Sequence, residues 1–344
     1  MVVSGQEYMD TRFTFDNGET SSHSMEVLYL IRRSHKIMSD LLPVFPVNDG
    51  CFEQALFGGT CNGRLLIGHE QGVYEYRKLE NRWSSVHHQC FNNNDVEGAE
   101  FTKFCVTQER VVICGGHIEN NNRRNKQVQL LKFQRESDQY LTNIKCPTLL
   151  PISLDRSHVL TSIGKNQIVL LGGNYPTGYD HPLARCVFQG SLSCTNDDII
   201  WKRMEPLKLP RISPLVFKMN DMIYVAGGVN QQGSLIRSCE RYDMSTRTWE
   251  VCKHSLPFNA DVKRASVVVS SDELLAIIIG CKDIPNPPGE SSSREKHIPR
   301  SNGLTGHELI VFCETKGFSM IDKNEFSTKI RFCSKRHISI IDQT

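Results

Sequence analysis

Short apolar runs that end in paired glycines recur along the chain. They are VVICGG at residues 111–116, IVLLGG at residues 168–173 and MIYVAGG at residues 222–228. A β-branched apolar run of this length is typical of a buried strand, and glycine supplies the positive backbone φ that tight turns need. No helix start or Lys-Ser/Thr pair follows, so a phosphate-binding role is disfavoured and the glycines are interpreted as structural. The glycines concerned are Gly115, Gly116, Gly172, Gly173, Gly227 and Gly228.

The spacing of these runs is regular. The first glycines of successive pairs lie 57 and then 55 residues apart, and degenerate copies without a full glycine pair occur at residues 65–68 and 276–280. Self-similarity at a period of about 50 residues indicates a repeat architecture. The sequence therefore predicts five copies of one unit, over residues 51–90, 101–150, 158–210, 212–258 and 264–323.

Aromatic residues define the second half of each unit. One aromatic is followed seven residues later by another in the pairs Tyr76 and Trp83, Phe133 and Tyr140, and Tyr242 and Trp249, and six residues later in Phe312 and Phe318. Polar hairpin residues lie between the members of each pair, which predicts two further strands after the glycine pair. We therefore expect four strands per unit, with Tyr242, Trp83, Trp201 and Trp249 packed between neighbouring units rather than exposed as ligand platforms.

Residues 222–252, with Gly227-Gly228, Glu240-Arg-Tyr242 and Trp249, resemble a kelch repeat. The sequence of this copy is most similar to the kelch domain of the kelch-like (BTB-kelch type) substrate adaptors. Two features depart from that family: no BTB domain is visible, and the first and fifth copies end in Gly-His and Gly-Cys instead of a glycine pair. The resemblance implies an all-β fold, a six-bladed kelch-type β-propeller with four antiparallel strands per blade. In such a ring each blade buries its two apolar faces against its neighbours.

The sixth blade must come from the chain ends. Residues 26–42 offer two strands and residues 328–341 offer two more, and joining N- and C-terminal strands in one blade closes the ring and removes an open edge. Whether residues 12–18 add a further strand stays open. We expect a flexible N-terminus over residues 1–20, a single propeller domain over residues 21–344, and a disordered loop over residues 282–306, which are rich in Pro, Ser and charge.

Composition narrows the function classes. The 344 residues carry 40 Lys and Arg against 38 Asp and Glu, a net charge of +2, which disfavours nucleic acid and anionic membrane surfaces as partners. The 13 Cys are odd in number and scattered, which favours reduced, buried thiols in a reducing compartment. With no apolar leader and no apolar run long enough to span a bilayer, we expect a cytoplasmic protein without a membrane.

Candidate chemistry is sparse. Kelch-like copper oxidases use a set of His and Tyr with a Tyr-Cys crosslink, and no such pattern is visible among the 12 His. The densest cluster, His87-His88-Gln-Cys90, lacks an evident fourth ligand for zinc. We expect no catalytic residue, metal or cofactor. The alternative is a kelch-propeller enzyme acting on a sugar or alcohol, of the epimerase, isomerase or oxidase type, which would need carboxylates converging in the central channel.

The loops that follow the glycine pairs are the candidate binding surface, because propeller loops vary while the strands hold them in place. They are rich in Asn, Gln, Tyr and Arg, which supply adaptable hydrogen bonds and planar contact area. Arg123 and Arg124 are suited to an acidic or phosphorylated ligand. The other candidate contact residues are Asn174, Tyr175, Tyr179, Asn230, Gln231 and Gln232.

The resulting hypothesis is a non-catalytic module that binds a segment of a partner protein. In the kelch-like adaptors the equivalent face captures such a segment, which implies possible ubiquitin ligase components as further partners. Those adaptors also carry an N-terminal dimerisation domain, whereas fewer than 50 residues precede the first complete repeat here. The chain is thus either a fragment or free-standing propeller, or a scaffold without ligase coupling.

Overall fold

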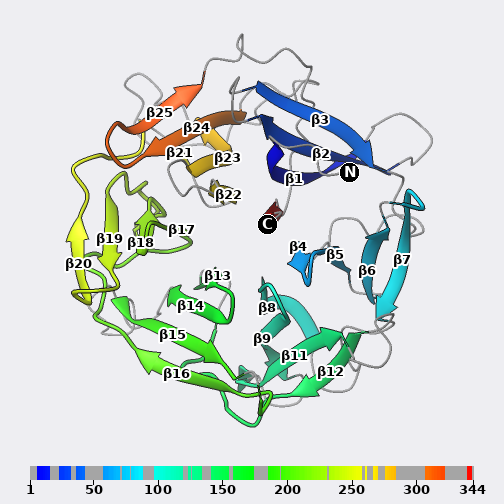
Figure 1. Ribbon diagram of the computed structural model, residues 1–344. Helices are drawn as coiled ribbons and strands as arrows, with labels where there is room; N and C mark the ends of the chain where they lie inside the picture. Colours follow the sequence, from blue (N-terminus) through cyan, green and yellow to red (C-terminus); the bar gives the residue numbers. More distant parts are fainter. Residues whose placement is uncertain are drawn as a thin grey trace, which may run out of the picture.

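The computed structural model is built from strands (Figure 1). It describes residues 6–15, 23–31, 36–42, 57–69, 72–77, 79–87, 97–118, 123–124, 126–133, 141–154, 158–173, 185–193, 195–230, 232–257, 260–261, 266–269, 276–283, 307–321 and 339–342. Within these residues the strands form six antiparallel sheets. The expected all-β fold of antiparallel four-stranded sheets is confirmed.

Five of the sheets follow one another along the chain, numbered here in chain order. Sheet 1 contains β4 (Phe57–Cys61), β5 (Arg64–His69), β6 (Gly72–Arg77) and β7 (Arg82–His87). Sheet 2 contains β8 (Glu97–Val106), β9 (Val111–Ile118), β10 (Arg123–Arg124), β11 (Val128–Phe133) and β12 (Leu141–Lys145). Sheet 3 contains β13 (His158–Gly164), β14 (Gln167–Gly172), β15 (Val187–Leu192) and β16 (Ile199–Arg203).

Sheet 4 contains β17 (Leu215–Met219), β18 (Met222–Ala226), β19 (Cys239–Asp243) and β20 (Thr248–Val251). Sheet 5 contains β21 (Ala260–Asp261), β22 (Ser266–Val269), β23 (Ala276–Asp283), β24 (His307–Cys313) and β25 (Gly317–Ile321). In sheets 2 and 5 the fifth strand is a short piece: β10 pairs with β9 as β11 does, and β21 pairs with β23 as β22 does. Each sheet therefore has four rows of paired strands, which we number from the innermost (first) to the outermost (fourth). In sheet 2 the third row is interrupted between β10 and β11, and in sheet 5 the first row is interrupted between β21 and β22.

The sixth sheet combines both ends of the chain. It contains β1 (Gln6–Phe15), β2 (His23–Ile31), β3 (Lys36–Leu42) and β26 (Ser339–Asp342), in the order β26-β1-β2-β3. The open question about residues 12–18 is answered by β1, which contains residues 12–15 and begins inside the segment expected to be flexible. The loop expected to be disordered, 282–306, lies outside the described residues except for its first two, which end β23.

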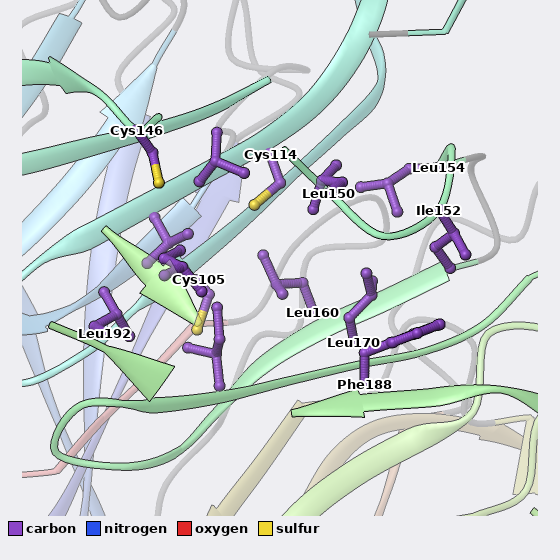
Figure 2. Close-up of a cluster of buried hydrophobic side chains, with 14 of the residues drawn as sticks. Cys105, Cys114, Cys146, Leu150, Ile152, Leu154, Leu160, Leu170, Phe188 and Leu192 are labelled. Atoms are coloured by element: carbon purple, nitrogen blue, oxygen red, sulfur yellow. The ribbon is translucent and has the colours of Figure 1, made fainter. Parts of the chain in front are cut away.

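The six sheets stand around a common centre, with β4, β8, β13, β17, β22 and β26 innermost and β7, β12, β16, β20, β25 and β3 outermost (Figure 1). The hydrophobic cores lie between neighbouring sheets rather than within one sheet. The core between sheets 2 and 3 includes Cys105, Cys114 and Cys146 (Figure 2). Burial raises the pKa of the Cys105 and Cys114 thiols well above the ordinary range. The eight cysteines whose side chains are described are free thiols, and six of them are buried.

The aromatic pairs stand directly opposite each other on the two outer strands of a sheet. Tyr76 is the register partner of Trp83 and Tyr242 that of Trp249, with ring centroids 5.4 and 5.1 Å apart. Phe312 and Phe318 do the same at 4.5 Å. Trp83, Tyr242 and Trp249 are buried, and Tyr140 lies outside the described residues. Cross-strand aromatic pairing is thus the element that recurs from sheet to sheet.

Sheet 3 replaces one member of this pair by glycine. Gly190 is the register partner of Trp201, which packs on the core between sheets 2 and 3. A Cβ atom on Gly190 would lie 2.8 Å from Ile168 Cγ1 and 2.9 Å from the Trp201 ring. The glycine is therefore required by the close approach of the tryptophan rather than by its backbone conformation.

Neighbouring sheets also meet at the rim, where the end of one outermost strand contacts the beginning of the next. The ring nitrogen Nδ1 of His87 lies 3.0 Å from the carbonyl oxygen of Leu141, and the Cys146 thiol donates to Asp198 Oδ1 at 3.0 Å. Trp249 Nε1 donates to the backbone carbonyl of Glu205 at 2.7 Å. We call these contacts the rim junctions.

Candidate functional site

Sheets 2, 3 and 4 carry their glycine pairs at one end, and we call this end of the molecule the double-glycine face. The second row runs toward this face: β9 continues through Gly115 to Ile118, β14 ends at Gly172, and β18 ends directly before Gly227. Because the strands alternate in direction, the first and third rows begin at this face and the fourth row ends there. The described residues of sheets 2 to 4 at this face are 97–100, 115–118, 123–124, 126–127, 145–154, 158, 172–173, 185–186, 203–214, 227–230, 232–238 and 252–257.

The glycines provide turns that other residues would strain. Positive φ values occur at Gly115, Gly172, Gly173, Gly227 and Gly228, and a Cβ on Gly228 would lie 2.7 Å from the carbonyl oxygen of Ile212. At Gly173 a Cβ would lie 2.4 Å from Nε2 of the buried His158. Gly116 lies in β9, and no turn geometry is described for it.

A buried ion pair fixes this end of sheet 4. The side chains of Arg211 and Glu240 are 0% exposed, and Arg211 Nη2 lies 3.0 Å from Glu240 Oε1. Arg211 also donates to the backbone carbonyls of Gly227 and Ser238 at 2.9 and 2.8 Å, and Glu240 accepts the backbone N–H of Lys208 at 2.6 Å. Because every charged group here is paired and hydrogen-bonded, burial of the pair is tolerated.

The loop of Arg123 and Arg124 extends sheet 2 instead of forming an irregular loop. As strand β10, Arg123 pairs with Ile118 and Arg124 pairs with His117, whose other register partner is Glu97 of β8. The side chains of the two arginines are not described, so their role in binding stays a prediction.

The other predicted contact residues are only partly described. Asn230 is half-buried and its Oδ1 accepts the Ser234 N–H at 2.8 Å, which forms a compact turn with Gln232 exposed beside it. Asn174, Tyr175, Tyr179 and Gln231 lie outside the described residues. The structure thus brings Asn230 and Gln232 together and leaves the rest of the predicted contact set as a prediction.

Sequence reasoning missed a basic residue that recurs at one position in three sheets. Lys126, Arg185 and Arg237 each lie two residues before a strand of the third row, namely β11, β15 and β19. The backbone carbonyl of each accepts an N–H from a buried leucine in the segment after the fourth row, at 2.8, 2.9 and 2.8 Å; the leucines are Leu150, Leu207 and Leu256. The three positions are therefore structurally equivalent. Aligning the repeats on their third strand would have revealed them.

Among the residues whose side chains are described, the double-glycine face of sheets 2 to 4 is strongly basic. They include one surface carboxylate, Glu205, which accepts the backbone N–H of Trp249 at 3.1 Å. The start of β8 adds Glu97 and Glu100 at the same end, and their side chains are not described. The exposed or half-buried cations in the same segments are Lys126, Lys145, Arg185, Arg203, Lys208, Arg237 and Lys253. Two exposed leucines, Leu149 and Leu209, lie among them at 49% and 42% exposure.

Charges at the opposite end of the sheets are balanced. There Glu80 pairs with Arg77 at 3.3 Å, Lys165 with Glu109 at 2.9 Å, and Lys218 with Asp221 at 3.0 Å. Among residues with described side chains, the net charge of +2 therefore conceals an uneven distribution, with unbalanced positive charges on the double-glycine face.

Metal sites and membrane-spanning helices each have typical arrangements, with which the described residues can be compared. Within the part of the chain that is described, no group of three or more His, Cys, Asp and Glu is arranged to hold a metal ion. His87 contacts a backbone carbonyl at a rim junction, and residues 88–90 of its cluster lie outside that part. The described residues also contain no helix with the length and apolarity to cross a bilayer.

Comparison with known proteins supports the fold. The kelch motif model matches residues 211–254, which include β17 to β20. The solved structure of YjhT superposes with a TM-score of 0.55 at 14% sequence identity, covering 92% of this chain and 98% of that one. No curated protein matches the sequence. At this level of identity the likeness shows a shared fold.

Proposed function

We propose that this chain is a closed six-bladed kelch-type propeller that binds an acidic or phosphorylated segment of a partner protein on its double-glycine face, without chemistry. Support for the ring comes from the kelch motif, from the likeness to YjhT over nearly the full chain, and from six sheets standing around one centre. In this proposal β26 and β1 close the ring, with Tyr8 to Thr11 paired to Asp342 to Ser339.

The charge of the double-glycine face carries the ligand proposal. Among the residues of sheets 2 to 4 with described side chains at this face, seven exposed or half-buried cations stand against one surface carboxylate, while the start of β8 adds Glu97 and Glu100. Such a surface attracts anions from a distance, and guanidinium groups then bind carboxylate or phosphate oxygens in bidentate geometry. Leu149 and Leu209 add apolar area at the same face, which suits a peptide with acidic and apolar residues together.

Within this proposal Arg123 and Arg124 pair with acidic groups of the ligand, Tyr175 and Tyr179 provide apolar contact, and the amides of Asn174, Asn230, Gln231 and Gln232 bond its backbone. Lys126 and Arg185 are added to that set by their equivalent positions. The proposal extends to a role either as the recognition part of a ubiquitin ligase adaptor or as a scaffold, and to residence in the cytoplasm.

The enzyme alternative stays open as a second hypothesis. It requires carboxylates that converge on a bound sugar or alcohol. In the described segments of the double-glycine face, Glu205 is engaged by Trp249 and Lys208, and Glu240 is buried against Arg211. These engagements favour binding over acid–base chemistry.

The proposal is tested with fluorescent peptides of matched length that are acidic, phosphoserine-containing or basic. We expect the first two classes to bind with an affinity that decreases as salt is added, and the basic class not to bind. Replacing both Arg123 and Arg124, or both Lys126 and Arg185, by Ala should weaken binding by about 2 kcal/mol, roughly 30-fold, with an unchanged unfolding curve.

Lys202→Ala is the matched control. Lys202 is an exposed cation within the outermost strand β16, outside the segments assigned to the double-glycine face, so its loss should leave binding unchanged. Affinity purification from native cells then identifies the partner, and recovery of a cullin-type ligase would support the adaptor role. Equal binding of acidic and basic peptides would reject the assigned face. Turnover of a sugar or alcohol by the purified protein would reject the binding-module class.

A further inference from the structure

Two cysteines stand opposite each other at the base of the outer hairpin of sheet 4. Cys239 begins β19, and Cys252 directly follows the end of β20. The adjacent register pair is Glu240 with Val251, and the N–H of Cys252 donates to the carbonyl oxygen of Cys239 at 2.8 Å. Directly opposed residues of a hydrogen-bonded antiparallel pair have Cα atoms about 5.5 Å apart, which lies within the range of about 4.4–6.8 Å that disulfides span.

The two thiols lie on the same face of the hairpin, against the core between sheets 4 and 5, and they differ in accessibility. Cys239 is buried and its thiol donates to the carbonyl oxygen of Glu240 at 3.7 Å, whereas Cys252 is half-buried. Interaction with the neighbouring Cys239 thiol, followed by the nearby Arg241 guanidinium, lowers the pKa of Cys252, whereas interaction with Cys252 and burial raise the pKa of Cys239. The partly accessible member of the pair is therefore the better nucleophile, and a second sulfur lies behind it.

The fold itself does not require this pair. The same backbone hydrogen bond joins Val128 to Cys146 in sheet 2 and Val187 to Met204 in sheet 3, at 2.9 Å in both cases. The position of Cys239 is thus occupied by valine in both of these sheets, and the position of Cys252 is occupied by cysteine in sheet 2 and methionine in sheet 3. In these three equivalent sheets, two opposed thiols occur in sheet 4 alone.

We propose that Cys239 and Cys252 form a redox modification site, at which a hydroperoxide converts the two thiols into an intrachain disulfide. A reactive, partly accessible cysteine beside a resolving cysteine is the arrangement found in redox-sensing proteins. This inference is independent of the partner proposed above.

The chemistry balances with a hydroperoxide as the oxidant. The Cys252 thiolate attacks one peroxide oxygen, the O–O bond breaks, and water or an alcohol leaves after protonation, which gives a sulfenic acid on Cys252. The Cys239 sulfur then attacks the Cys252 sulfur, the S–O bond breaks, and water leaves with the proton of Cys239. Two thiols lose two electrons, the peroxide gains them, and a thiol reductant reverses the step by exchange.

The test uses the full chain treated with hydrogen peroxide, after which remaining thiols are alkylated and the protein is digested with trypsin. Cys239 and Cys252 fall in separate tryptic peptides, 238–241 and 248–253. We expect these two peptides to appear linked, to lose both hydrogens of the thiols, and to separate when dithiothreitol is added. Cys313 is an internal comparison, because it is half-buried and its pKa is lowered, first by a hydrogen bond from Thr315, without a second cysteine placed opposite it.

Two variants take the residues of the sister sheets and so preserve the packing. In Cys239→Val the linked peptide should vanish and dimedone should trap sulfenic acid on Cys252. In Cys252→Met both the linked peptide and the trapped sulfenic acid should vanish. A wild-type protein in which Cys252 accumulates as trapped sulfenic acid without a link, or in which the linked peptide forms only after urea unfolds the chain, would overturn the proposal.

Discussion

Gly190 shows how one missing side chain determines a local arrangement. Sheet 3 has an aromatic residue, Trp201, opposite a glycine where sheets 1 and 4 have two aromatics. The ring lies over the glycine so closely that a Cβ there would be 2.9 Å from it. Packing of the tryptophan against the core between sheets 2 and 3 therefore depends on the absence of one methyl group.

We expect Gly190→Ala to lower the free energy of unfolding by about 1–3 kcal/mol, because the added methyl overpacks a filled core. Urea unfolding monitored by tryptophan fluorescence measures the change. Gly164→Ala is the control, since a Cβ there meets Gln167 at 3.7 Å, an ordinary contact distance. Equal effects of the two substitutions would contradict the close approach of Trp201.

The buried ion pair gives a second expectation at this scale. Glu240→Ala leaves the Arg211 guanidinium buried without its carboxylate, and we expect a loss of about 3–5 kcal/mol of unfolding free energy. Glu250→Ala, which removes an exposed partner of Arg241, should cost at most about 1 kcal/mol. Equilibrium denaturation of both variants provides the comparison, and a small effect at Glu240 would show that water reaches the pair.

Residue-scale predictions from sequence succeeded where partners are close along the chain. Tyr242 and Trp249 are joined by one hairpin, so the spacing alone places them opposite each other. Arg211 and Glu240 are 29 residues apart and meet because the segment after sheet 3 folds back onto β19. Long-range pairs of this kind depend on the register and packing of two sheets, which a repeat pattern does not specify.

At the scale of elements, the rim junctions join sheets that have different sequences. Between sheets 2 and 3 the Asp198 carboxyl accepts the Cys146 thiol and the N–H groups of Thr148 and Ile199. These hydrogen bonds, first among them that of Cys146, lower the pKa of Asp198 below its ordinary value. The junction is therefore sensitive to acid.

A carboxyl whose pKa is lowered by folding stabilises the protein fully above its ordinary pKa, and this stabilisation is lost as the pH falls through the folded-state pKa. We expect the urea midpoint of wild type to decrease below about pH 4 by more than that of Asp198→Asn. Cys146→Ala should shift the profile in the same direction as Asp198→Asn. Parallel pH profiles for wild type and Asp198→Asn would remove Asp198 from the acid response.

Element-scale prediction from sequence also had a clear limit. The repeat period placed the units, but β8 begins at Glu97 and β21 at Ala260, before the expected unit boundaries, because strand pairing continues into the connecting segments. The basic residues Lys126, Arg185 and Arg237 were missed because glycine pairs were aligned, and the loops after those pairs differ in length. Alignment on the third row removes that difference.

At the scale of the whole molecule, the proposed ring depends on a short strand from the end of the chain. β26 pairs with β1 over Tyr8 to Thr11, and β1 pairs with β2 on its other side. Without β26, which lies between β1 and β4, the edge of β1 would expose unpaired backbone groups. Exposed edges of this kind favour pairing between molecules.

Removing residues 339–344 should therefore lower the melting temperature and produce dimers or larger species. Removal of residues 343–344, which leaves β26 intact, should do neither. Light scattering coupled to size-exclusion chromatography measures the size, and differential scanning calorimetry measures the melting temperature. A monomeric long truncation with an unchanged melting temperature would contradict ring closure by the two ends.

The rim junctions also constrain how such a chain can change over generations. The contact between sheets 1 and 2 joins a histidine to a backbone carbonyl, and that between sheets 2 and 3 joins a thiol to a carboxylate. The contact between sheets 3 and 4 joins a backbone carbonyl to an indole N–H. Each sheet therefore fits its own successor better than any other. Although the units share one repeat pattern, inserting, deleting or exchanging one of them would create mismatched neighbours on both of its sides, so we expect evolution to preserve their order as strictly as their number.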